Sequence, residues 1–350
     1  MAQGAPEPRE GTSFGPTDVA ARAAAAASHA QAMAEAAACE MSVPDGLRLD
    51  ERTLRGMRQA LERIVQDIER CLAAALAESA FPGIGPTLPL LQAAGLTADP
   101  ALTAELLAQV QRAHLIAGLP HHAPDDPLQP SLLNRLADHP APELAAAARA
   151  LQLAESRAHS PEAGRWRLPP ALHMRLLWWV ASAMREQLGA SAGRALDTVL
   201  CAAVREQGAD AESRNGAEAA ADRLAALLAP TPREVPRLLI DALRDRSLSL
   251  FEAVLARAAA IDPADARALL LDPGSERLLL VLRALAVPRE TIARIGLLLC
   301  DADPRRDLAG LVDAIDALDT IDPEAAQDVL AQLRLDPGYR AARLAIGRRR

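Results

Sequence analysis

Aliphatic residues in this chain recur at intervals of three and four, and that spacing constrains the fold more than any other feature. The pattern is clearest between Asp50 and Ala77. Its apolar stripe consists of Leu54, Met57, Leu61, Ile64, Val65, Ile68, Leu72 and Leu76. Arg and Glu occupy the other side, so this segment is predicted to form an amphipathic helix. Such a stripe suits an antiparallel neighbour in the same chain or the same stripe of a dimer mate.

The composition favours helices throughout. Hydrophobic residues make up 50% of the chain and aromatic residues only 2%, so any core is built from Ala, Leu, Val and Ile. Ala and Leu are strong helix formers, and the β-branched residues that favour strands are sparse. We therefore predict an all-α protein. Its 350 residues suffice for two domains or one extended helical array.

Many of the predicted helices begin with Asp followed by Pro. The Asp side chain accepts a hydrogen bond from a backbone N–H at the helix start, and Pro occupies a position that needs no donor. Helices are predicted near residues 232–244, 248–260 and 323–333, among others. Short helices joined by Pro-bearing turns favour a stack of short antiparallel helix pairs, HEAT-like or solenoid-like, after an N-terminal helical segment.

Two segments of the second half resemble each other. Residues 261–263 and 271–274 read Ile-Asp-Pro and Leu-Asp-Pro-Gly, and the same letters recur at 321–323 and 335–338. A period of about sixty residues would correspond to two helix pairs of a degenerate repeat. The alternative is that Asp-Pro simply recurs at helix starts.

Breaks in the helical pattern suggest the domain organisation. Residues 1–16 are rich in Gly and Pro and are predicted to be disordered. A helical region follows at 17–159, with an Ala-rich stretch up to Met41, then a linker at 160–168 and a helical-repeat-like domain at 169–347.

The residue inventory excludes several enzyme classes. The chain contains no Lys, which a Walker-type phosphate loop, a pyridoxal enzyme and a protein kinase all require. A net charge of −8 argues against nucleic-acid binding, and the basic run Arg348, Arg349 and Arg350 is interpreted as a solvated tail.

Nothing in the sequence predicts export or membrane insertion. No secretory signal and no apolar run of about 18 residues is present. The widely spaced Cys39, Cys71, Cys201 and Cys300 are expected to be small core or half-buried residues in a reducing environment. We therefore predict a cytoplasmic protein.

Histidines cluster in one Pro-rich region, which makes it the best candidate for a metal site. The candidate ligands are His114, His121, His122, Asp125, Asp126 and His139. Imidazoles and carboxylates are ligands for zinc and other divalent ions, but the spacing lacks a fixed geometry, and a solvated polar loop is the competing interpretation. His173 or His114 could alternatively accept a phosphoryl group from a phosphorelay.

Two further groups have both a structural and a functional interpretation. Trp178 and Trp179 are adjacent on a predicted helix and point about 100° apart, so they fit either a core or a partner surface. The acidic series Asp313, Asp316, Asp319 and Asp322 lacks the Gly turn and final Glu of a calcium loop, so it is expected to be a solvated face with Asp322 as a helix cap.

The second half of the chain resembles a known bacterial family. The resemblance rests on residues 168–173, 177–181, 282–285, 287–290 and 339–341. These segments are similar to the family called domain of unknown function 2336. That resemblance implies a helical fold and brings no catalytic residues or cofactor with it.

We expect a non-enzymatic cytoplasmic scaffold or regulatory adaptor that needs no cofactor and presents a helical surface to another protein. The expected contact residues are Leu54, Leu61, Ile68, Trp178 and Trp179, with a homodimer through the 54–76 stripe as one form. The rival expectations are a metal-dependent enzyme using the His114–His139 region and a phosphorelay component with a helical His.

Overall fold

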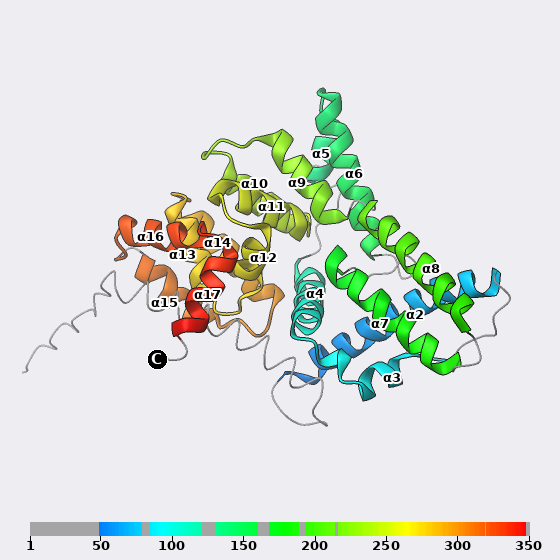
Figure 1. Cartoon of the computed structure of the whole chain (residues 1–350). Coiled ribbons are helices and arrows are strands. Elements are labelled where there is room, and N and C mark those ends of the chain that lie inside the picture. Colours follow the sequence, from blue (N-terminus) through cyan, green and yellow to red (C-terminus); the bar gives the residue numbers. More distant parts are fainter. Residues whose placement is uncertain are drawn as a thin grey trace, which may run out of the picture.

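The computed structural model describes residues 49–78, 85–120, 131–159, 168–188, 193–213, 216–318 and 320–347. Within these ranges the chain forms helices and turns, without a strand, as the all-α prediction requires (Figure 1). The predicted disordered tail at 1–16, the Ala-rich stretch after it and most of the 160–168 linker lie outside the described residues.

The helices are short and follow one another closely. The first part of the chain contains α2 (Glu51–Glu78), α3 (Leu88–Ala93), the 3₁₀ helix η1 (Leu96–Ala98), α4 (Pro100–Gly118), α5 (Leu132–Ala137), α6 (Pro142–His159), α7 (Pro170–Leu188) and α8 (Gly193–Ser213). The second part contains α9 (Ala217–Leu228), α10 (Val235–Arg244), α11 (Leu248–Ala259), α12 (Pro263–Leu271), α13 (Glu276–Ala284), α14 (Arg289–Ala302), α15 (Leu308–Leu318), α16 (Pro323–Leu333) and α17 (Pro337–Gly347).

Two hydrophobic clusters hold these helices together, and both draw on residues from each side of the 160–168 segment. One unites α2, α3, most of α4, α7 and α8. The other unites the end of α4 with α5, α6 and the helices from α9 to α16. Figure 1 shows the first group around α2 and α7, with α4 between it and the rest. The predicted division at 160–168 therefore does not separate the two clusters.

The apolar stripe of α2 is covered by helices of the same chain. α2 packs against α4, α7 and α8. Leu61 and Ile68 are only 2% and 4% exposed, while Leu54 is half-buried. Of the two predicted roles for the stripe, the intramolecular neighbour is the one found. Leu61 and Ile68 are not on the surface of the folded chain, which corrects their assignment as contact residues.

The predicted Asp-Pro helix starts are confirmed. Asp99 accepts a hydrogen bond from the N–H of Leu102 at 2.8 Å. Asp262 and Asp322 do the same for the N–H two residues on, at 2.8 Å and 3.0 Å. The helices after the two similar Asp-Pro segments both pack on α13, but α12 also packs on α11 and α4. The HEAT-like repeat itself stays a prediction.

Several helices end in a left-handed residue that is not glycine. Arg246, Ala260 and Ala286 have φ values of 58°, 54° and 55°. In each case the next residue's N–H donates to a carbonyl five residues back, as in Val287 N to Leu282 O at 3.0 Å. This motif ends the helix sharply and turns the chain into the next one.

Candidate functional site

A group of charged and hydroxyl side chains, most of them buried or half-buried, lies where α4, α6, α9, α11 and α12 meet. We call it the buried charge cluster, and it comprises Glu105, Arg112, Glu155, Glu218, Ser247, Ser249, Glu252 and Arg267. On α4, Arg112 donates from Nη1 to Glu252 Oε2 at 3.1 Å and from Nη2 to Ser249 Oγ at 2.6 Å. The same Nη1 lies 3.3 Å from Glu218 Oε1.

The outer parts of the cluster extend this pairing to α6 and α12. Arg267 on α12 contacts both oxygens of Glu105 on α4, at 3.1 Å and 3.2 Å. Ser247, just before α11, donates to Glu155 Oε1 on α6 at 2.6 Å. Through these contacts α4 is connected to helices of the larger hydrophobic cluster.

Burial raises the pKa of two carboxyl groups in the cluster, those of Glu252 and Glu155. It raises the pKa of Glu252, with Arg112 and Arg267 acting in the opposite direction. It also raises the pKa of Glu155 to about 7, against hydrogen bonds from Ser247 and Ser249. Raised carboxyl pKa values occur in acid–base catalysis and also in structural ion-pair networks. Here the carboxyl groups are paired with arginines and serines of neighbouring helices.

Sequence reasoning missed this cluster. Its local signal is Glu252, which together with Ser249 interrupts the otherwise apolar run 248–256 on α11. Because the partners of Glu252 come from other helices far along the chain, the sequence pattern alone could not assemble them. Its Oε1 atom has no hydrogen-bond partner among the described residues, which leaves a buried acceptor unsatisfied.

The predicted metal site is described only in part. His121, His122, Asp125 and Asp126 lie outside the described residues. His139 is exposed and its Nδ1 accepts a hydrogen bond from the N–H of Ala141 at 3.1 Å, next to the start of α6. Among the described residues, no three His, Cys, Asp or Glu side chains are grouped to hold a metal ion.

The two histidines considered as phosphoacceptors have different surroundings. The pKa of His114 is lowered by burial and by the positive charge of Arg52, while Asp50 and Asp303 oppose this. Residues from the start of α2 and from the turn after α14 thus meet beside the end of α4. His173 is half-buried near the start of α7.

The two tryptophans differ in exposure. Trp178 is 37% exposed on α7, whereas Trp179 is half-buried against the α2 cluster. The same α7 face carries Arg175, which pairs with Asp99 at 2.8 Å. Leu90 on the neighbouring α3 is 38% exposed. Of the predicted contact residues, Trp178 is therefore the one the fold presents to solvent.

The acidic series and the cysteines are distributed among surface and partly buried positions. Asp316 pairs with Arg289 at 2.5 Å, Asp322 caps α16, and Asp319 lies outside the described residues. Cys71 is exposed, which corrects its expected place in the core, while Cys201 and Cys300 are half-buried as expected. Cys39 lies outside the described residues.

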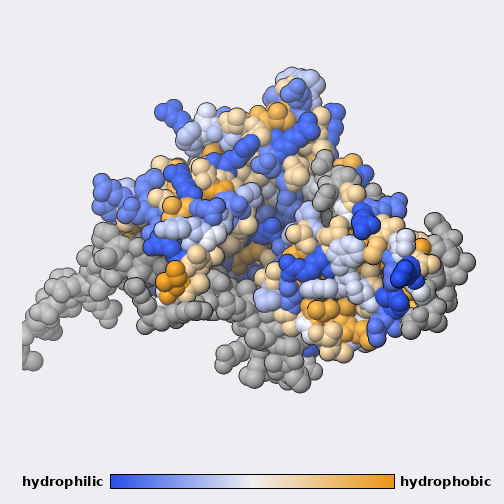
Figure 2. Space-filling model, viewed as in Figure 1, coloured by the Kyte–Doolittle hydropathy of each residue, from blue (hydrophilic) through white to orange (hydrophobic). Residues whose placement is uncertain are grey.

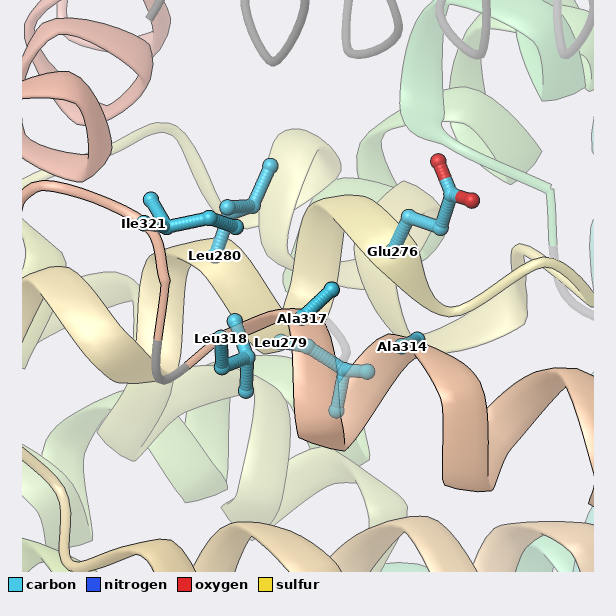
Figure 3. Close-up of a pocket in the computed structure, with 7 residues that line it drawn as sticks. All are labelled: Glu276, Leu279, Leu280, Ala314, Ala317, Leu318 and Ile321. Atoms are coloured by element: carbon cyan, nitrogen blue, oxygen red, sulfur yellow. The ribbon is translucent and has the colours of Figure 1, made fainter. Parts of the chain in front are cut away.

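A small apolar hollow lies between α13 and α15. Figure 3 shows Leu280 and Ile321 at one end and Glu276 at the other. Leu279, Leu318 and the small residues Ala314 and Ala317 complete its lining. Its single ionisable group gives it no set of converging catalytic side chains.

The chain matches a protein-family model. A family model described as "Uncharacterised protein conserved in bacteria (DUF2336)" matches residues 126–331, more than half of the chain. The match begins before Leu168, where the family-like segments in the sequence start, and ends before Tyr339. No curated protein and no solved structure matches the chain. Among the described helices, none is sufficiently long and apolar to cross a bilayer.

Proposed function

The chain belongs to the DUF2336 family of bacterial proteins, and from that premise we propose that it is a non-enzymatic helical adaptor that binds another protein through the exposed face of α7. The observation that carries the proposal is the exposure of Trp178 beside a helix that also exposes an apolar side chain. A large aromatic residue that the fold leaves accessible is the residue type most enriched at interface hot spots.

The surroundings of Trp178 have the composition of a protein-binding surface. α3 packs on α7, and Leu90 extends the apolar surface beyond Trp178. In Figure 2, apolar side chains gather over the region of α3 at the lower right. Charged pairs occupy the same side of α7, including Arg175 with Asp99 and Arg185 with Asp197. An apolar centre with a polar rim is the usual anatomy of an interface.

A matched pair of tryptophan variants tests the proposal. The partner is first isolated with the full wild-type chain, and its dissociation constant is measured. We expect Trp178→Ala to weaken binding by tenfold or more while changing stability little, because Trp178 is partly exposed. Trp179→Ala removes a side chain packed on the core, so we expect it to lower stability more.

A second experiment, photo-crosslinking, tests directly whether the partner binds at this face of α7. A photo-crosslinking residue at position 178 should join the chain to the partner, whereas the same residue at Leu153, an exposed position on α6, should not. A strictly monomeric chain that captures no stoichiometric partner contradicts the proposal. Unchanged affinity of the Trp178→Ala variant does so as well.

A further inference from the structure

The last helix, α17, lies on the surface of the protein although its sequence contains several apolar residues. None of its residues is buried. Its main attachment is the pair between Arg340 and Asp265 on α12, in which Nη1 lies 3.0 Å from Oδ1. Asp336 accepts a hydrogen bond from the Tyr339 N–H at 3.1 Å, at the start of the helix. Figure 1 shows α17 on the outside of the helices around α12 and α14.

The outward face of α17 combines apolar and cationic side chains. Tyr339 and Ile346 are 56% and 64% exposed. Arg343 lies between them at helical spacing, and its guanidinium carbon is 5.9 Å from the centre of the Tyr339 ring. Leu335, one turn before Tyr339, is also exposed. Arg340 and Leu344 are the half-buried residues, so the body lies on their side.

Charge is segregated onto this segment. Residues 337–350 contain five arginines and no acidic residue, although the chain as a whole has a net charge of −8. Asp265 pairs with Arg340. Arg343 is the other charged residue of α17, and Arg348, Arg349 and Arg350 follow it in the sequence. Among the described residues, Asp265 pairs with Arg340 of α17, and Asp336 caps the start of the helix.

We propose that α17 attaches the chain reversibly to an anionic lipid surface. A short helix that exposes Tyr and Ile with an Arg beside them can lie in the plane of a membrane interface, where Tyr is favoured at the headgroup level. Each Arg close to an anionic surface strengthens binding by about fivefold. Two exposed apolar side chains add a modest contribution, so the attachment is peripheral and sensitive to salt.

The observations favour lipid over an acidic protein as the occupant. A protein interface surrounds its apolar centre with a rim of mixed polar groups. On α17 the one charged side chain of the outward face is the cationic Arg343, which lies between the apolar Tyr339 and Ile346. In a membrane interface, the Arg would meet anionic headgroups while the Tyr and Ile side chains reach the hydrocarbon just below them.

Vesicle sedimentation of the full chain tests the proposal. We expect the chain to sediment with vesicles of phosphatidylcholine mixed with phosphatidylglycerol, and to remain in solution with phosphatidylcholine alone. Binding should be lost near 1 M salt, where screening acts over about 3 Å. Arg343→Glu should weaken binding by about tenfold or more, and Tyr339→Ser combined with Ile346→Ser should also weaken it.

The matched control makes the same charge change elsewhere. Arg294 is exposed on α14, so Arg294→Glu changes the net charge equally but leaves α17 intact. It should bind vesicles within about twofold of the wild type, and circular dichroism should show every variant folded. Equal binding to neutral vesicles, an equal loss with Arg294→Glu, or no binding to anionic vesicles at low salt would each overturn the proposal. Binding of an acidic protein through Arg343 without vesicle binding overturns it too.

Discussion

The Nη1 atom of Arg112 on α4 lies 3.1 Å from Oε2 of Glu252 on α11, and this ion pair joins positions 140 residues apart in the sequence. Both side chains are largely removed from solvent. The pair therefore ties α4, which shares in both hydrophobic clusters, to the larger of them.

Breaking this pair from one side should be costly. Arg112→Met leaves Glu252 buried without its partner, and we expect a loss of about 3 kcal/mol or more in the free energy of unfolding. Arg112→Met combined with Glu252→Met should recover most of that loss, because neither position then holds an unpaired buried charge. Urea unfolding measures both. Arg55→Met is the control, since the exposed Arg55–Glu51 pair should contribute less than about 1 kcal/mol. Equal effects of Arg112→Met and Arg55→Met would contradict the prediction.

Glu155 should make stability depend on pH. Its pKa is raised from 4.5 to about 7, chiefly by burial. Between these values the folded chain holds a proton that the unfolded chain has released, so stability falls as pH rises from about 4.5 to about 7 and then levels off. The contribution is at most about 3 kcal/mol.

Glu155→Gln isolates this effect from other titrating groups. Gln keeps an acceptor for the Ser247 hydroxyl but cannot ionise, so the variant should gain stability relative to the wild type as pH rises through this range. The measurement is the midpoint of urea unfolding at several pH values. Parallel curves for variant and wild type would show that Glu155 does not titrate in this range.

Gly118 should tolerate no side chain. A Cβ at this position would lie 2.0 Å from the carbonyl oxygen of Ala302, a backbone atom at the end of α14. The two helix ends would have to separate, so we expect Gly118→Ala to cost about 2 kcal/mol or more. Gly347→Ala meets no atom within 4 Å and is the control. Thermal unfolding compares them, and equal midpoints would show that the close approach is not required.

The acidic series should divide into one structural residue and solvated neighbours. Asp322→Ala removes the cap of α16 and should cost about 1 kcal/mol. Asp313→Ala, on the exposed side of α15, should change stability by less than about 0.5 kcal/mol. Chemical unfolding of the two variants side by side checks this. A larger effect for Asp313 would point to a role for the acidic face that capping does not explain.

Helix positions were predictable where local chemistry sets them. The prediction for 323–333 matches α16, because Asp322 and Pro323 mark its start. The prediction for 232–244 began too early. There Thr231 donates from its N–H and hydroxyl to Glu234 at 2.9 Å and 2.8 Å, which stabilises a turn, and α10 starts at Val235.

The candidate sites were less predictable than the helices. The exposure of Trp178 and the half-buried position of Trp179 follow from which helices pack on α7, and both positions look alike in the sequence. Likewise, Arg112, the ion-pair partner of Glu252, lies on a helix that no local pattern links to α11. The exposed face of α17 could not be predicted either, since its amphipathic pattern resembles that of buried helices.

By itself, the sequence determined that this chain is helical and where most helices begin. Those properties depend on side-chain spacing, Asp caps and Pro, all of which act within a turn or two of the backbone. Only the tertiary structure decided that α7 and α8 return to α2, that Arg112 meets Glu252, and that α17 keeps an exposed face. The physical reason is that aliphatic stripes of Leu and Ala are nearly interchangeable, so pairing depends on burial and desolvation summed over the whole chain.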